Sequence, residues 1–304
     1  MRAIILGSAA GGGVPQWNCG CANCVDARSR GANRTQSSVA LSADGERWIL
    51  LNASPDLRSQ LAAHRELWPC GPRGSPVAAV ILTDAEIDHT LGLLLLRESA
   101  AALPVYAPAG VTALLGSEWP LYRVLAAYAG VEPRALEDGR PIALADASGT
   151  PLGISCSASA VVRRPPRYAR AAPAAPAATF DVGLRLTDER TGATLAYVPT
   201  AGAVDDAVRR VATGADLLLF DGTFWSDGEL RAAGVDAPTA REMGHLPVGG
   251  PGGSLELLAS LGAKRTVLVH VNNTNPLLRA RSPERAQVEA AGIVVGADAM
   301  EFEL

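Results

Sequence analysis

The chain has 304 residues, of which 48% are apolar and 5% aromatic, and its 27 basic and 31 acidic side chains leave a net charge of −4. That charge, without a lysine- or arginine-rich helix, argues against a nucleic-acid-binding surface. No apolar run reaches about 18 residues, which excludes a membrane-spanning helix. The apolar run near the start of residues 1–7 is short and ends early at Gly7, so we expect a first β-strand rather than a signal peptide. A cytoplasmic protein with no nucleic-acid or membrane partner is predicted.

Short apolar runs alternate along the chain with alanine- and leucine-rich runs of helical length. Strands are predicted, in chain order, at residues 2–6, 38–42, 47–52, 77–82, 104–106, 194–198, 216–220, 266–270 and 292–295. Helices are predicted at residues 56–66, 90–101, 110–117, 120–129, 204–213, 227–233 and 253–262. This order indicates an α/β fold with one domain over residues 1–304, in which two mixed sheets lie face to face with helices outside.

Three of the five cysteines are clustered after the first predicted strand, as Cys19, Cys21 and Cys24. In a reducing compartment, such clustering favours a metal over disulfides. The short separations also make disulfide geometry among the three difficult. The cluster therefore predicts a zinc site, with three unliganded thiols in a loop as the alternative.

Two histidines follow predicted strands. Asp88 and His89 come after the apolar run 77–82 and before a leucine-rich run, and His270 follows the run 265–269. An isolated Asp-His pair is typical of a helix N-cap carboxylate beside a surface histidine. However, strand ends are where α/β folds place chemistry, and this sequence has two such junctions. We therefore treat all three residues as site candidates.

Residues 163–176 are rich in proline, arginine and alanine. The proline density forbids a regular helix or a central strand. We interpret the segment as an exposed connector. The alternative is a basic lid over an anionic substrate, because three of its first five residues are arginines.

Six blocks, in order along the chain, resemble the pyrroloquinoline quinone biosynthesis protein B family: residues 6–24, 34–38, 52–58, 220–225, 241–246 and 270–276. The resemblance implies a metallo-β-lactamase-like αββα sandwich. It also implies a structural Zn(II) on Cys19, Cys21 and Cys24. In related phosphodiesterases a histidine completes this zinc site, whereas the matching position here is Asn273. We expect Asn273 or a water as the fourth ligand, although zinc prefers sulfur and nitrogen donors.

Residues 83–89 resemble the superfamily metal motif Thr-His-x-His-x-Asp-His, with two replacements. Asp84 and Glu86 stand where the two histidines of the first metal would be. Relatives also carry a bridging aspartate near a Thr-Ala-Gly sequence, where this chain has Pro199. No histidine lies between His89 and His245. The resemblance therefore predicts that the first-metal site and the bridge are both missing.

The ligands that remain are Asp88, His89 and His270. Two imidazoles and one carboxylate are the facial triad of mononuclear non-haem Fe(II) oxygenases. The same set would also bind a single zinc in a hydrolase. The missing bridge argues against two-metal hydrolysis, and the family resemblance favours oxidation.

Asp221 and His245 are further catalytic candidates. Asp221 ends the predicted strand 216–220, and it is interpreted as an acceptor that orients a metal-bound histidine, as an additional ligand, or as a turn-forming Asp-Gly. His245 matches a position that phosphodiesterase relatives use for proton transfer, so we assign it acid–base or substrate-positioning work.

The substrate contacts are predicted from charge. A tyrosine-containing dipeptide carries carboxylates, for which Arg34 and Arg58 are candidate anchors. Asp84 and Glu86 are expected to point inward as uncoordinated carboxylates that take protons or orient a metal-bound water.

These observations lead to a functional hypothesis. The chain is expected to be an Fe(II)-dependent oxygenase that uses O₂ to hydroxylate the tyrosine ring of a small Glu-Tyr-type peptide during pyrroloquinoline quinone (PQQ) formation. A single-metal hydrolase of the peptide precursor and a non-enzymatic PQQ carrier are the alternatives. The sequence leaves the oligomeric state open, a homodimer included.

Overall fold

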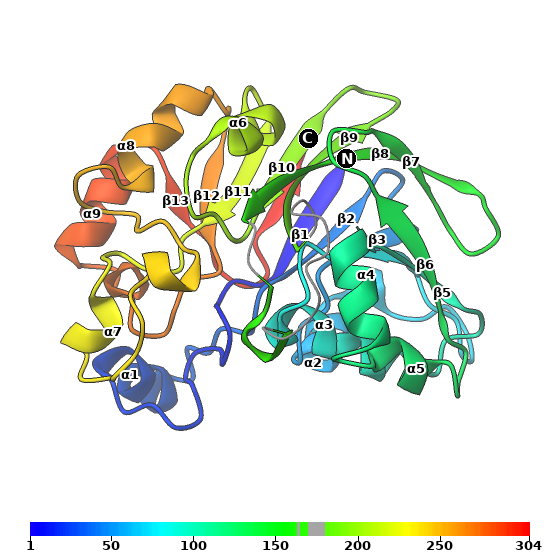
Figure 1. Ribbon diagram of the computed structural model, residues 1–304, viewed down its shortest axis with the longest axis horizontal. Helices are drawn as coiled ribbons and strands as arrows, with labels where there is room; N and C mark the ends of the chain where they lie inside the picture. The colour runs from blue at the N-terminus through cyan, green and yellow to red at the C-terminus, as the bar shows by residue number, and fades with distance from the viewer. Residues whose placement is uncertain (163–164, 170–179) are drawn as a thin grey trace.

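The computed structural model describes residues 1–162, 165–169 and 180–304 (Figure 1). In these residues two seven-stranded sheets pack face to face. The first has the order β14 (Glu301–Glu303), β1 (Arg2–Gly7), β2 (Ser38–Ser42), β3 (Trp48–Leu51), β4 (Val77–Ile81), β5 (Leu103–Pro108) and β6 (Val131–Leu136). The second has the order β13 (Val294–Val295), β12 (Thr266–Val269), β11 (Leu217–Asp221), β10 (Thr194–Val198), β9 (Asp181–Asp188), β8 (Pro151–Val162) and β7 (Ile142–Ala145).

Both sheets are mixed, as predicted. In the first, the pairs from β14 to β3 are antiparallel and those from β3 to β6 are parallel. In the second, the pairs from β7 to β10 are antiparallel and those from β10 to β13 are parallel. The αββα sandwich expected from the resemblance is confirmed.

The strands are apolar on both faces because each sheet is covered on one face by the other sheet and on the opposite face by helices. In β3, Ile49 and Leu51 pack between the sheets, whereas Trp48 and Leu50 pack on the helical side. The first sheet is covered outside by α2 (Leu57–Ala63), α3 (Ile87–Thr90), α4 (Ala109–Gly116) and α5 (Leu121–Leu125). The second is covered by α6 (Asp206–Ala212), α8 (Ser254–Leu258) and α9 (Pro283–Ala290).

Two more helices, α1 (Ala22–Arg30) and α7 (Glu229–Ala232), lie together at one end of the sandwich in Figure 1. None of the helices in the described ranges is long and apolar enough to cross a membrane.

The nine predicted strands are present with bounds that differ by at most two residues. The predicted helix 90–101 is instead α3 followed by a 3-10 turn, Leu91–Leu96. Strands β6 to β9 and β14, and helices α1 and α9, were not predicted. Of the segment interpreted as a connector or lid, residues 163–164 and 170–176 lie outside the described residues.

The parallel strands bring polar side chains to one edge of the sandwich. Asp84 follows β4, Asp221 ends β11, and His270 follows β12. The Val182 amide at the start of β9 donates to the Thr83 carbonyl at 2.9 Å, which joins the second sheet to the end of β4 in the first. Residues from both sheets therefore meet at this edge.

Candidate metal centre

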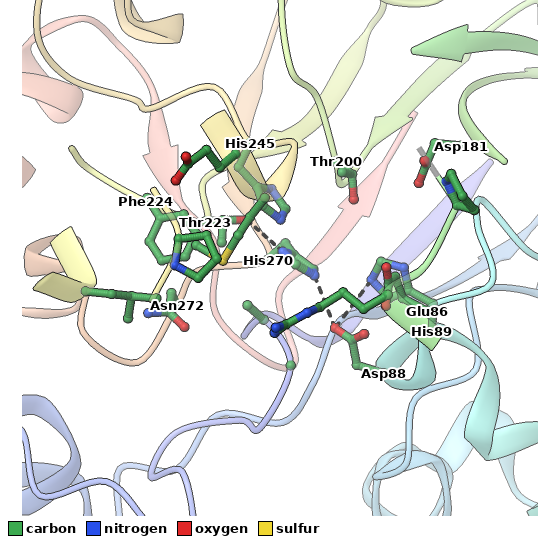
Figure 2. A pocket seen from close by; sticks show the side chains of 18 residues that line it. Glu86, Asp88, His89, Asp181, Thr200, Thr223, Phe224, His245, His270 and Asn272 are labelled. Carbon is green, nitrogen blue, oxygen red and sulfur yellow. Dashed lines mark hydrogen bonds and ion pairs between the residues drawn. The ribbon is translucent and has the colours of Figure 1, made fainter. Parts of the chain in front are cut away.

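Asp88, His89 and His270 converge, as the sequence predicted. Asp88 and His89 lie on α3, and His270 comes from the opposite sheet. One ligand atom from each residue lies within 4.8 Å of the others. Asp88 Oδ2 is 3.3 Å from His270 Nε2 and 3.9 Å from His89 Nε2 (Figure 2). These separations suit three donors around one ion.

His270 reaches this position through an unusual backbone conformation. Its φ is 58°, in the left-handed region that non-glycine residues seldom adopt. The next residues are fixed by the Val271 amide, which donates to the Ser8 carbonyl at 2.9 Å, and by the Asn272 amide, which donates to the Thr223 carbonyl at 3.0 Å. Local backbone strain of this kind concentrates at functional sites.

The Nδ1 atoms of both histidines are held by buried acceptors. His89 Nδ1 lies 2.6 Å from Asp84 Oδ2. His270 Nδ1 lies 2.7 Å from Thr223 Oγ1, whose hydroxyl donates to Asp221 Oδ1 at 2.6 Å. Such partners fix the tautomer that leaves Nε2 free to bind a metal.

The donor set fits a metal ion. His89 Nε2 is buried and has no hydrogen-bond partner among the described residues. Leaving a buried ring nitrogen unpaired is costly, and a metal bound by His89, His270 and Asp88 removes that cost. Two imidazoles and one carboxylate suit zinc or ferrous iron.

The charges around the triad are strongly coupled. Burial disfavours the His89 imidazolium, but the negative charges of Asp84 and Asp88 outweigh this effect and raise the pKa of His89 to about 10. Burial also opposes ionisation of Asp88, yet His89 and His270 hold its pKa well below the ordinary value. Burial lowers the pKa of His270. Asp88 is therefore an anion ready to bind a cation.

Asp84, which the sequence suggested as a substrate contact, does not line the cavity. Its Oδ2 lies against His89 and accepts the Thr83 hydroxyl at 2.8 Å, while Oδ1 accepts the Glu86 amide at 2.9 Å. Asp84, which stands where the superfamily motif has a histidine of the first metal, thus orients His89 of the triad. Glu86, by contrast, does line the cavity.

Asp221 has both of its oxygens occupied. Oδ1 accepts the Thr223 amide and hydroxyl, and Oδ2 accepts the Ala201 amide at 2.9 Å and faces His245 Nδ1 at 2.8 Å. Asp221, His245 and His270 also have ligand atoms within 4.8 Å of one another. Because Asp221 already has four partners, the geometry favours its interpretation as an acceptor over that as a ligand.

His245 lies beside the triad and lines the same cavity. Its ring stacks on that of His270, with centroids 5.5 Å apart and planes 22° apart. Burial disfavours its charged form, but Asp221 outweighs burial and raises the pKa of His245. The Asp221–His245 pair can therefore take up and hold a proton next to the metal ligands.

The cysteine cluster forms a second metal-type set. The sulfur atoms of Cys19, Cys21 and Cys24 lie within 4.8 Å of one another. Asn273 Nδ2 lies 3.0, 3.7 and 3.4 Å from these sulfurs in that order. Asn273 is thus where the fourth ligand was predicted, and rotation of its amide by half a turn presents Oδ1 to the sulfurs instead.

This cluster is joined to the triad through one loop. Asn23 of α1 donates to the carbonyls of Asn273 and Asn275, both at 2.9 Å. Although burial opposes ionisation, hydrogen bonds from neighbouring backbone and thiol groups lower the pKa of Cys21, which favours the thiolate that a metal requires. The loop from His270 to Asn275 therefore contributes to both sets.

The two arginines predicted to anchor substrate do not line the cavity. Arg34 turns away from it, donating to Ser8 Oγ at 3.1 Å and to the Gly296 carbonyl. Arg58 is on the solvent face of α2, which buries Leu57 and Gln60 instead. The structure therefore places both arginines outside the cavity, a placement that the sequence does not reveal because it does not give the direction of a side chain on its element.

The cavity at the triad has a volume of about 550 Å³. Phe224, Leu230 and Met243 give it an apolar part, and Glu86, Arg167 and Asp181 give it a charged part. Figure 2 shows Phe224 and His245 on one side, with Glu86 and Asp181 on the other. Sequence reasoning did not single out Thr223 or Asp181, and it considered Arg167 only as one of the three arginines of the alternative basic lid; Thr223 was visible only as part of the block 220–225 that resembles the family.

Known proteins resemble the whole chain. A family model described as a β-lactamase superfamily domain matches residues 47–271. Coenzyme PQQ synthesis protein B from Cupriavidus necator is 46% identical over 99% of this chain and 98% of its own length. The chain belongs to the coenzyme PQQ synthesis protein B family, within the β-lactamase superfamily. The family expected from the sequence is confirmed.

Further relatives support the same family and the same fold. The protein of the same name from Methylococcus capsulatus is 43% identical over 99% of both chains. A crystal structure of Zn²⁺-bound PqqB from Methylobacterium extorquens is 38% identical, covers 100% of both chains and has a TM-score of 0.88. A diphosphatase of the PhnP family, with 23% identity and a TM-score of 0.69, shares the fold.

Proposed function

We propose that this protein acts in PQQ biosynthesis as a non-haem Fe(II)-dependent oxygenase that hydroxylates the tyrosine ring of a small peptide-derived precursor. The observation that carries the proposal is the convergence of Asp88, His89 and His270 within 4.8 Å, with both Nδ1 atoms already held. The PQQ role follows from the family, whose members are named for PQQ synthesis.

The support for a single metal comes from what surrounds the triad. Asp84, at a position where relatives bind a first metal, is committed to His89. Asp221 is committed to His245 and Thr223. A second ion would therefore have to displace existing hydrogen bonds, whereas a single ion at the triad gives the unpaired His89 Nε2 a partner.

Ferrous iron, when bound by Asp88, His89 and His270, supplies the O₂ activation that zinc cannot supply because zinc has no redox chemistry. Hydroxylation replaces a ring C–H bond by C–OH and reduces the second oxygen atom to water. It consumes two electrons and two protons, which a small-molecule reductant must provide.

The remaining residues bind and orient the substrate. Phe224, Leu230 and Met243 form an apolar surface on which an aromatic ring can pack. His245, held by Asp221 at 2.8 Å, is suited to accept the phenolic proton. Thr223 keeps His270 in one tautomer and thereby holds the geometry of the site.

The test is an oxygen-uptake assay on protein reconstituted anaerobically with Fe(II), with a Glu-Tyr dipeptide and ascorbate. The proposal predicts uptake that requires the peptide and a product heavier by one oxygen atom; zinc-loaded protein should give neither. Cleavage of the peptide by the zinc form would instead support the single-metal hydrolase. Tight binding of PQQ without turnover would support the carrier.

A further inference from the structure

The cavity has an acidic wall that the proposed chemistry leaves unexplained. Asp181 begins β9 and Glu86 follows β4, and both line the cavity. Asp181 is only 8% exposed. Its carboxylate accepts no hydrogen bond and forms no ion pair within the described residues. Because burying an unpartnered carboxylate is costly, Asp181 either holds a proton or faces a bound cation, and its position on the cavity wall leaves room for the cation.

The acidic wall is held firmly in place. The hydrogen bond from the Val182 amide to the Thr83 carbonyl fixes the start of β9 against the end of β4. The Tyr168 hydroxyl donates to the Ala85 carbonyl at 2.6 Å, which fixes the turn Arg167–Ala169 to the same loop. Asp181 and Glu86 are therefore positioned relative to α3, which carries Asp88 and His89.

A metal ion does not suit this wall. The carboxylates of Asp84, Glu86 and Asp181 are not among the described groups whose oxygens lie within 4.8 Å of one another. An ammonium group suits it better, because its three N–H donors diverge and can reach separate carboxylates. Arg167 lines the same cavity but forms no ion pair with Asp181 or Glu86 within the described contacts, so it does not neutralise them.

We propose that Asp181 and Glu86 form a subsite for the ammonium group of an amino-acid-derived substrate. This inference rests on the proposed function, since it requires the aromatic part of the same molecule to lie at the triad. Burial, together with the charges of Asp84 and Glu86, raises the pKa of Asp181 well above its ordinary range. A bound ammonium would oppose that shift. Arg167 is placed in the same cavity to receive the carboxylate of such a substrate.

The test compares binding of Glu-Tyr with that of N-acetyl-Glu-Tyr, in which acetylation removes the ammonium charge. Calorimetry on Fe(II)-loaded protein without O₂ measures binding in the absence of turnover. The parent should prefer the free amine about tenfold or more, as expected for a charge-assisted hydrogen bond. Asp181→Asn should reduce the preference to less than about threefold.

Two further variants supply a second test of the subsite and a matched control. Glu86→Gln should weaken the preference in the same direction, and it replaces Asp181→Asn if that variant does not fold. Glu242→Gln neutralises another carboxylate that lines the cavity, and it should keep the parental preference. Equal binding of both peptides by the parent, no binding of the free amine, an unchanged preference in both subsite variants, or an equal loss in Glu242→Gln would each overturn the subsite.

The two proposals can fail separately. A preference that depends on Asp181 without any oxygen uptake would retain the subsite and reject the oxygenase. Oxygen uptake with no preference for the free amine would retain the oxygenase and reject the subsite.

Discussion

Thr223→Val should loosen the metal centre without changing a single ligand. Thr223 Oγ1 lies 2.7 Å from His270 Nδ1 and donates to Asp221 Oδ1 at 2.6 Å, both in buried surroundings. Valine has nearly the same shape but no hydroxyl, so it removes both hydrogen bonds and leaves the His270 N–H unpaired. The two bonds and the unpaired donor together amount to about 2–4 kcal/mol of lost folding free energy in the metal-free protein.

The larger effect should fall on metal binding. Loss of a partner that orients a ligating histidine typically costs about 10–100-fold in metal affinity. The assay is chelator competition for the triad metal, with urea unfolding of the metal-free protein measured in parallel. Thr223→Ser is the matched control, since it keeps the hydroxyl and should stay within a few-fold of the parent. Parental metal affinity in Thr223→Val, or an equal loss in Thr223→Ser, would refute the role of the hydroxyl.

Two other predictions test separate parts of the molecule. Cys21→Ser should lower both the zinc content and the free energy of unfolding, because a structural zinc contributes folding energy. Cys70→Ser, at an exposed cysteine, is the control and should change neither. A metal-free Cys21→Ser variant that is as stable as the parent would contradict the structural site. Asp216 pairs with Lys264 at 2.6 Å and accepts the Thr194 amide at 2.7 Å, and these contacts lower its pKa to about 2. The pKa of Asp216 in the folded protein lies below its unfolded value of about 3.9, so Asp216→Asn should lower the free energy of unfolding by about 1 kcal/mol at pH 7 after solvent screening. This stability difference from the parent should shrink between about pH 4 and pH 2. A difference that persists at pH 2 in urea unfolding would refute the ionic origin.

The sequence predicted those parts of the fold in which local pattern and tertiary position agree. Strands such as β4 and β12 are apolar on both faces, so their runs are unmistakable, and the histidines that follow them, His89 and His270, could be located. β8 was missed because its serines, alanines and glycine give a weak apolar signal, and β6 because it contains Pro133. Without β8 and β9, the sequence offered no reason to bring Asp181 to the cavity.

The direction of side chains limited the prediction of the site. Asp84 was expected to point into the cavity, but a buried hydrogen bond to His89 turns it away. Arg34 was expected to meet substrate, but the Gly296 carbonyl, 262 residues away in the chain, holds its guanidinium. Thr223 became meaningful only once β11 and β12 lay side by side and placed its hydroxyl between Asp221 and His270. These are contacts between distant segments, which local patterns do not encode.

The number of metal ions at the triad tests the central claim most directly. Anomalous diffraction from crystals of the Fe(II)-loaded protein would locate every ion. The account predicts one iron peak, roughly 2.0–2.3 Å from donor atoms of Asp88, His89 and His270, besides the zinc at the cysteines. His270→Ala should lose the iron peak and the peptide-dependent oxygen uptake but keep the cysteine-bound zinc. Two peaks about 3.5–4 Å apart at the triad, the spacing of two-metal hydrolases, would contradict the single-metal oxygenase.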